Sequence, residues 1–290
     1  MQGTLFAFTP IPYPNIFQNM EHDIRLIALD LDGTLTNERK EITPLTYNTL
    51  MKAQQQGIRL CLASGRPPYG MRPLADQLHM SEHGGILMCY NGGHVEECST
   101  GKVLVERKLD EECLPILYDY QKLSGLTLMT YHGCNIYTEH ADDQYVRQSS
   151  RNNKMEIIAV DNFIADTPRP LNKCLMVGPP SDIPEWEQRM AKDLKGKMHI
   201  CRSTPYFIEC LPNDIDKGTA LADILTSLNL TTKNAMAFGD SYNDITMLQT
   251  AGIGVAMGNA EDAIKAVSKH VTTSNEDDGV AVALRHILHL

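Results

Sequence analysis

A short apolar run that ends in two carboxylates constrains this chain more than any other feature. Residues 25–29 are Arg-Leu-Ile-Ala-Leu, and Asp30 and Asp32 follow directly. Four apolar residues in a short bounded run are typical of a strand buried on both faces of a parallel sheet. The next residues, Gly33-Thr34, let the backbone turn sharply. Because open α/β sheets bind ligands at the carboxyl ends of their strands, we expect chemistry at Asp30 and Asp32.

Two other interpretations of this stretch are open. Asp32-Gly33 is also a plain turn signal. Counted from Asp30, a calcium-binding loop would place oxygen ligands at positions 3, 5, 9 and 12, which are Asp32, Thr34, Glu38 and Glu41. Such loops need glycine at position 6 and a preceding helix. Here position 6 is Leu35 and the lead-in is a strand pattern, which disfavours the calcium loop.

Downstream, short apolar runs alternate with helical patterns, and the runs end in polar residues beside glycine. The runs and the residues after them are 58–63 with Ser64-Gly65, 86–90 with Asn91-Gly92-Gly93, and 235–238 with Gly239-Asp240. Parallel strands end at one edge of a sheet, so Asp30, Asp32, Ser64 and Asn91 are expected to converge on one site. The sequence predicts an α/β fold with a Rossmann-like parallel-sheet core.

Between Asn91 and Asp216 the pattern changes. Two hairpins are predicted, residues 126–131 with 135–138 and residues 198–203 with 206–211, and helices precede them. This order is typical of an α+β module with an antiparallel sheet and helices on one face. The alternating stretch 102–109 is assigned to the same module. Because the strand and helix alternation resumes afterwards, the module is predicted to be an insertion.

These patterns divide the chain into a core, an inserted cap and a leader. The core is predicted to comprise residues 23–92 and 211–290, and the cap residues 93–210. Loop-like residues 91–93 and 211–214 are the expected hinges of a cap that closes over substrate. Residues 1–22, rich in proline, are expected to form a leader or extension without regular structure, and the natural start could lie at Met20.

Charge and cysteine content limit the partners and the compartment. The net charge of −10 over 290 residues argues against a nucleic-acid partner, because phosphate backbones select basic faces. No stretch resembles a signal peptide or a membrane span. The eight cysteines form no CxxC pair, and several lie in apolar runs. We therefore expect a reduced, cytoplasmic protein whose partner is a small molecule and neither a nucleic acid nor a membrane.

The predicted site suits a phosphoryl group bound with a metal ion. Asp30, Asp32, Asp240 and Asp244 at one edge would repel one another unless a cation lay among them. Mg²⁺ is the expected ion, because it takes carboxylate oxygens together with substrate phosphate. Lys217 begins a helix and adds a positive charge that can reach a carboxylate and a phosphoryl oxygen. Ser64 and neighbouring backbone amides offer further hydrogen-bond donors.

A carboxylate can act as nucleophile and form an aspartyl-phosphate that water hydrolyses. We assign that role to Asp30, because a strand end is rigidly placed and in-line attack tolerates little positional error. Asp32 is then the acid that protonates the leaving alkoxide and the base that activates water.

Four motifs in the same order resemble those of the haloacid dehalogenase superfamily, over essentially residues 23–290. The motifs are Asp30-Leu31-Asp32-Gly33-Thr34-Leu35, Ser64-Gly65-Arg66, Asp216-Lys217-Gly218 and Gly239-Asp240-Ser241-x-Asn243-Asp244. The insert between the second and third motifs, with Asn91-Gly92-Gly93 at its edge, resembles the Cof-type branch (subfamily IIB) with a C2B cap. The resemblance implies a Mg²⁺-dependent phosphatase of small phosphorylated metabolites, such as sugar phosphates, nucleotides or cofactor phosphates.

The resemblance also implies roles for single residues. It makes Asp30 the nucleophile and Asp32 the acid and base, with the Asp32 backbone carbonyl on the metal. Ser64 and Lys217 match the phosphate-binding pair, and Asp240 matches a metal ligand. Asn243 and Asp244 match the motif that supports the metal. The assignment is therefore catalytic residues Asp30 and Asp32, phosphate-binding residues Ser64, Gly65, Asn91, Lys217 and Asn243, and metal ligands Asp30, Asp32, Asp240 and Asp244.

Other interpretations remain open at this point. Ser64, Asp240 and Asp244 could merely cap helices, and Asn91 could be only a turn. Arg66 could reach substrate, cap or solvent. Gly252-x-Gly254-x-x-x-Gly258 does not fit a dinucleotide-binding motif. On the same scaffold, a phosphomutase-type phosphotransferase and a catalytically silent phosphate-binding protein are the alternatives to a phosphatase.

Overall fold

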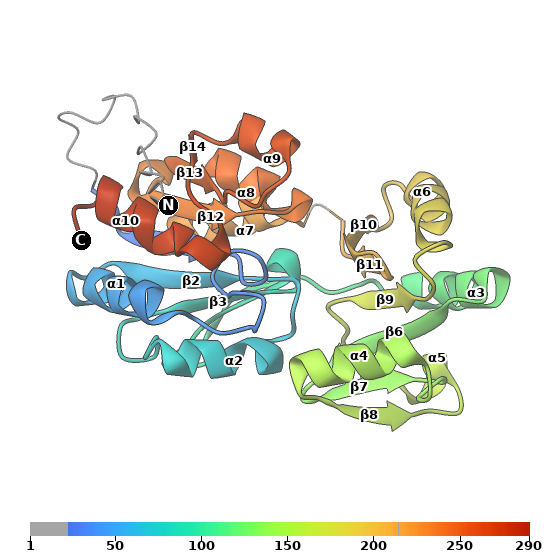
Figure 1. Cartoon of the computed structure of the whole chain (residues 1–290). Helices are drawn as coiled ribbons and strands as arrows, with labels where there is room; N and C mark the ends of the chain where they lie inside the picture. Colours follow the sequence, from blue (N-terminus) through green and yellow to red (C-terminus); the bar gives the residue numbers. More distant parts are fainter. Residues whose placement is uncertain (1–22, 214) are drawn as a thin grey trace, which may run out of the picture.

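A computed structural model describes residues 23–213 and 215–290 of the chain, which form two domains, each built around its own sheet (Figure 1). The predicted leader, residues 1–22, lies outside the described residues. So does Asp214, the last residue of one predicted hinge. Within the described ranges, no helix is long and apolar enough to cross a membrane.

The larger sheet has eight strands in the order β14-β13-β12-β1-β2-β3-β4-β5. Six of them are parallel: β1 (Leu26–Leu29), β2 (Arg59–Ala63), β3 (Ile86–Cys89), β12 (Ala235–Gly239), β13 (Ile253–Ala256) and β14 (His270–Val271). Strand β1 lies between β2 and β12, and all four of its residues are buried. The predicted Rossmann-like core and the buried first strand are confirmed.

Helices cover both faces of this sheet because its strands are apolar on both sides. Ile27 and Leu29 pack in the same hydrophobic cluster as α1 (Pro44–Gln55), α2 (Pro68–Gln77) and α10 (Gly279–Ile287). Leu26 and Ala28 point to the other face and pack with α7 (Lys217–Ser227), α8 (Ile245–Thr250) and α9 (Asp262–Val267). Two-sided burial fixes the position of β1 and hence of the carboxylates at its end.

Two antiparallel strands extend the larger sheet beyond β3, and this corrects the predicted domain boundary. Strand β4 (His94–Glu97) pairs with β3, and β5 (Val103–Glu106) pairs with β4. Residues 94–106 therefore belong to the core sheet and not to a cap that begins at residue 93. Strand β4 could not be predicted from the sequence because its residues, His-Val-Glu-Glu, contain only one apolar side chain. A hairpin at the edge of a sheet tolerates such a polar composition.

The cap sheet has six strands in the order β10-β11-β9-β6-β7-β8. These are β6 (Thr127–His132), β7 (Asn135–Thr138), β8 (Glu156–Ala159), β9 (Cys174–Val177), β10 (His199–Thr204) and β11 (Phe207–Leu211). The two predicted hairpins are confirmed as the antiparallel pairs β6-β7 and β10-β11. Strand β8, which is parallel to β7, was not predicted.

The cap helices lie on both faces of the cap sheet, whereas the sequence predicted one. Helices α3 (Cys113–Ser124), α5 (Phe163–Asp166) and α6 (Ile183–Asp193) pack with Leu128 and Met176 on the outer face. Helix α4 (Gln144–Asn153) packs with Met129 and Leu175, which point the opposite way. Because these residues on the second face of the sheet are also apolar, they are buried by a helix on that face as well. Helix α4 lies beside α2 of the core, so the second face of the cap sheet is turned toward the core (Figure 1).

Candidate active site

Asp30 stands at the carboxyl end of β1 and is held by a buried lysine. The Asp30 backbone N–H donates to the carbonyl of Phe238 at 3.1 Å, which continues the pairing of β1 with β12. Lys217 begins α7, its side chain is fully buried, and its Nζ donates to Asp30 Oδ1 at 2.6 Å and to Asp244 Oδ1 at 2.7 Å. The lysine therefore joins motifs that are 187 residues apart in the chain.

Asp240 and Asp244 complete an acidic cluster with Asp30. Asp240 follows β12, and its Oδ1 accepts a hydrogen bond from Thr34 Oγ1 at 2.7 Å. The other carboxylate, Asp244, accepts from the backbone N–H groups of Asp240 and Ser241, both at 3.0 Å. One oxygen from each of the three acids lies within 4.8 Å of the others. Asp244 therefore has both roles: it accepts hydrogen bonds from backbone N–H groups, as a capping residue does, and it belongs to the acidic cluster.

Gly33 permits the close approach of the first motif to Asp240. Its φ of +85° is in the left-handed region, and a Cβ there would lie 2.5 Å from Asp240 Oδ2. The turn after β1 can therefore wrap against this carboxylate only because residue 33 has no side chain.

Two of the acids, Asp30 and Asp244, are buried and Asp240 is half-buried, and Lys217 is the one cation that contacts Asp30 and Asp244 among the described residues. Burial raises the pKa of Asp30 well above its usual range; Lys217 opposes this shift, and Asp244 and Asp240 reinforce it. Burial also raises the pKa of Asp240, to about 6, against the hydrogen bond from Thr34. Burial lowers the pKa of Lys217, but the carboxylates of Asp244 and Asp30 raise it more, so this residue stays charged. An all-oxygen set of crowded carboxylates fits Mg²⁺.

The Asp32 carboxylate points away from the acidic cluster. Arg66 donates to both of its oxygens, from Nε at 3.0 Å and from Nη2 at 2.7 and 2.8 Å, and Lys40 Nζ donates at 2.7 Å. Burial raises the pKa of Asp32, but the Arg66 guanidinium and the Lys40 ammonium outweigh it and hold that pKa below its usual value. A contact of Asp32 with a metal therefore stays a prediction that involves its backbone carbonyl and not its side chain.

Besides Lys217, the predicted phosphate-binding residues are linked to one another through Asn91. Ser64 ends β2, and its Oγ accepts from the N–H of Arg66 at 3.3 Å, which is a local turn contact. The Asn91 N–H donates to the Ser64 carbonyl at 3.0 Å. Asn91 has a φ of +57°, is buried, and accepts from Asn243 Nδ2 at 3.0 Å. The structure thus brings Ser64, Gly65, Asn91 and Asn243 into one connected network.

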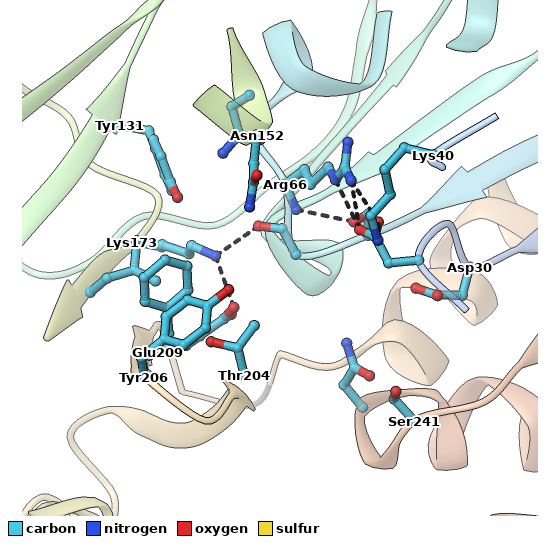
Figure 2. Close-up of a pocket in the computed structure, with 17 residues that line it drawn as sticks. Asp30, Lys40, Arg66, Tyr131, Asn152, Lys173, Thr204, Tyr206, Glu209 and Ser241 are labelled. Atoms are coloured by element: carbon cyan, nitrogen blue, oxygen red, sulfur yellow. Dashed lines mark hydrogen bonds and ion pairs between the residues drawn. The ribbon is translucent and has the colours of Figure 1, made fainter. Parts of the chain in front are cut away.

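A cavity of about 250 Å³ opens between these core residues and the cap (Figure 2). The core contributes Asp30, Asp32, Lys40 and Arg66, among others. The sequence did not identify the cap wall, which consists of Tyr131, Asn152, Asn153, Lys173, Leu175, Thr204, Tyr206, Phe207 and Glu209. A signal was present for two of them. Lys173 precedes a run of four apolar residues, and Glu209 interrupts another, which is unusual for charged side chains in a buried sheet.

An inserted cap domain, a lysine that bridges two carboxylates and an acidic cluster at strand ends are together expected of the phosphoryl-transfer enzymes that the sequence motifs resemble. Residues 27–284 match the family model described as haloacid dehalogenase-like hydrolase, and the chain belongs to that family. A solved structure of a haloacid dehalogenase-like hydrolase from Bacteroides thetaiotaomicron is 42% identical, with a TM-score of 0.86 over 91% of this chain and 99% of that one.

Curated relatives extend the comparison to named phosphatases. The 5-amino-6-(5-phospho-D-ribitylamino)uracil phosphatase YcsE of Bacillus subtilis is 30% identical, covering 93% of this chain and 98% of its own. The pyridoxal phosphate phosphatase YbhA of Escherichia coli is 27% identical, covering 89% and 96%. The predicted family and the predicted enzyme class, a phosphoric monoester hydrolase, are confirmed.

Proposed function

We propose that the protein is a Mg²⁺-dependent phosphatase that hydrolyses small phosphorylated metabolites through an aspartyl-phosphate at Asp30. The observation that carries this function is the buried Lys217, whose Nζ contacts Asp244 at 2.7 Å and, at 2.6 Å, Asp30, a residue that lines the cavity. An ammonium in this place stabilises the negative charge of a phosphoryl group while it is transferred to the adjacent carboxylate.

In the first step, a carboxylate oxygen of Asp30 bonds to phosphorus, and the bond from phosphorus to the ester oxygen breaks. Asp32 gives its proton to that leaving oxygen. An anionic ester that enters beside Arg66 and Lys40 neutralises their charge and raises the pKa of Asp32, which favours the protonated acid. Asp30 and Asp240, with the backbone carbonyl of Asp32, would hold Mg²⁺, which supplies neutralisation of the phosphoryl charge.

In the second step, water attacks the phosphorus of the aspartyl-phosphate, and Asp32 accepts its proton. The phosphorus–oxygen bond to Asp30 breaks, which regenerates the carboxylate and releases inorganic phosphate. The salt bridge with Arg66 holds the Asp32 carboxylate in a fixed orientation for this task. We assign the orientation of the remaining phosphoryl oxygens to Ser64 and Asn243, which line the cavity, and to Asn91, which accepts a hydrogen bond from Asn243.

The substrate is proposed to be a small phosphate monoester, because a cavity of about 250 Å³ limits the leaving group. The named relatives act on a phosphorylated ribitylaminouracil and on pyridoxal phosphate, which are compounds of this class. We also place the enzyme in the cytoplasm, since its eight cysteines are free thiols.

Phosphate release from a panel of sugar phosphates, nucleotides and cofactor phosphates tests this function. The enzyme and its Asp30→Asn variant are each assayed with Mg²⁺ and with a chelator. We expect release only from the unaltered enzyme with Mg²⁺. Release of no phosphate from any ester by folded enzyme would contradict a hydrolase, and transfer to a second substrate hydroxyl would instead identify a phosphotransferase.

A further inference from the structure

The cap carries a buried ion pair that the reaction described above does not use. Lys173, just before β9, and Glu209, in β11, are 3% and 2% exposed, and Lys173 Nζ lies 3.1 Å from Glu209 Oε1. Both side chains line the cavity from the cap side (Figure 2). Charged residues this deeply buried need several partners to offset the loss of their hydration.

The core provides half of those partners. Lys173 Nζ donates to the backbone carbonyl of Gly65 at 2.7 Å, and Asn91 Nδ2 donates to Glu209 Oε2 at 2.7 Å. Asn91 in turn accepts from Asn243 at 3.0 Å. A continuous chain of polar contacts therefore runs from the cap sheet to the segments that follow β2, β3 and β12, and the last of these segments carries Asp240 and Asp244 of the acidic cluster.

The fit between the ion pair and the core loop is close. A Cβ at Gly65 would lie 3.1 Å from Glu209 Oε1 and 3.3 Å from Asn91 Nδ2. The rings of Tyr131 and Tyr90, stacked with their centres 6.3 Å apart, place their centres 5.6 and 6.0 Å from Lys173 Nζ. These rings form an apolar wall beside the charge. The ion pair is thus fully compensated only while the cap lies against the core.

We propose that Lys173 and Glu209 are positioning residues through which the seated cap orders the phosphate-binding loops of the core. Glu209 fixes the Asn91 amide, and Lys173 fixes the Gly65 carbonyl, between Ser64 and Arg66. The site then reaches its reactive geometry only with the cap closed, which ties hydrolysis to a water-excluded state. This inference rests on the proposed function, because it assigns those loops to the phosphoryl group.

Positioning and leaving-group recognition predict different kinetics. If the two residues order the phosphoryl site, their loss lowers kcat for every ester, including p-nitrophenyl phosphate, whose leaving group is a simple aryl alcohol. If they instead recognise the leaving group, their loss raises KM for the metabolite and leaves the aryl ester unaffected.

The experiment compares the unaltered enzyme with Glu209→Gln and with Lys173→Met/Glu209→Leu. The double variant replaces the whole pair by apolar side chains, an exchange that buried ion pairs often tolerate without loss of stability. We expect kcat to fall about 10- to 100-fold on both p-nitrophenyl phosphate and the best metabolite, as small displacements in an active site cause. Thr138→Val is the matched control, since the buried Thr138 hydroxyl bonds only to cap residues among its described contacts, donating to the Leu128 carbonyl and accepting from the His140 N–H, and does not line the cavity, so kcat should be unchanged.

A double-mutant cycle then tests the bond between cap and core. Glu209→Gln and Asn91→Ala should be non-additive in kcat, because both break the same contact. Additive effects, a KM change confined to the metabolite, or a lower melting temperature with unchanged kinetics would each overturn the inference. Inactive but folded wild-type enzyme would overturn the proposed function and this inference with it, whereas active wild type beside unaltered variant kinetics would overturn this inference alone.

Discussion

Each domain contains a buried lysine, Lys217 in the core and Lys173 in the cap, and the surroundings of the two differ. Lys217 contacts two carboxylates, with a third, Asp240, in the same cluster. Lys173 contacts one carboxylate and one backbone carbonyl, beside two tyrosine rings. Negative charge is in excess around the first lysine and is balanced around the second.

The difference assigns distinct tasks to the two domains. An excess of carboxylates is stable only with additional positive charge, and for this reason we propose that the core binds the metal ion and carries the reaction. A balanced ion pair attracts no ion, but it requires hydrogen-bond partners, and in this protein the core loops supply them. In this proposal the core performs the chemistry, and the cap is positioned by its contacts with the core.

Substitution of each lysine gives the largest expected effect and tests whether the two lysines have different roles. Lys217→Met should lower kcat by about 10³-fold, because the transferred charge loses its main protein cation. Lys173→Met should lower kcat only about 10- to 100-fold, because it acts through the loops. Phosphate release at saturating substrate, with folding checked by circular dichroism, measures both. Equal losses in the two variants would contradict the separation of roles.

Mg²⁺ should stabilise the protein through the core carboxylates, and this effect should not depend on the ion pair of Lys173 with Glu209. At a hundred times its Kd, Mg²⁺ should raise the free energy of unfolding by about 2.7 kcal/mol, and a chelator should remove this gain. Asp240→Asn should abolish the effect, because it removes a carboxylate of the cluster. Glu209→Gln should retain it. Urea unfolding of each variant, with and without Mg²⁺, measures the stabilisation by the metal. If Glu209→Gln lost this stabilisation and Asp240→Asn kept it, the assignment of the metal site to the core carboxylates would be wrong.

Gly33→Ala tests the close packing of the first motif on Asp240. A side chain at a φ of +85° is strained, by about 1–3 kcal/mol, and here its Cβ would also displace the Asp240 carboxylate. Gly57→Ala is the matched control, with a φ of +83° and nothing within 4 Å of the added Cβ. Both variants should lose stability, but only Gly33→Ala should bind Mg²⁺ more weakly in a calorimetric titration. Equal metal affinities would refute the packing argument.

Gly70→Ala should give the smallest effect, at the contact between α2 and α4. Its Cβ would lie 2.5 Å from Asn153 Oδ1, so the cap would seat less closely. We expect KM to rise by less than about tenfold, equivalent to under ~1.4 kcal/mol. Adding Asn153→Ala removes the obstruction and should restore KM. If the double variant is no better than Gly70→Ala, the cap does not close through this contact.

The sequence was most informative where one strand determines the surroundings of a side chain. The buried run before Asp30 and the rule that parallel strands end at one edge were enough to bring Asp30, Asp240 and Asp244 together, whereas Lys217 was assigned as the first residue of a helix and by its motif. This rule places strand ends, but it does not predict the direction in which a side chain points. Asp32 is only two residues from Asp30, yet its carboxylate turns to Arg66 because that guanidinium lies at the end of the neighbouring strand.

The features that were not predicted share a physical cause: they depend on tertiary contacts, which a local sequence pattern does not contain. Strand β4 lacks an alternating pattern because it forms an edge hairpin, so the boundary at residue 93 was wrong for residues 94–106. The pairing of Lys173 with Glu209 joins strands of the cap sheet whose order no local pattern determines. Their unusual charge within apolar runs was the available signal.

The most direct test of the account is to identify the residue that carries the phosphoryl group during turnover. The enzyme is mixed with Mg²⁺ and its best ester, quenched rapidly in acid, digested and analysed by mass spectrometry. We predict that the peptide containing Asp30 gains one phosphoryl group, which hydroxylamine removes, and that Asp30→Asn gains none. Phosphate release without a phosphorylated Asp30, or with the group on another residue, would contradict the account.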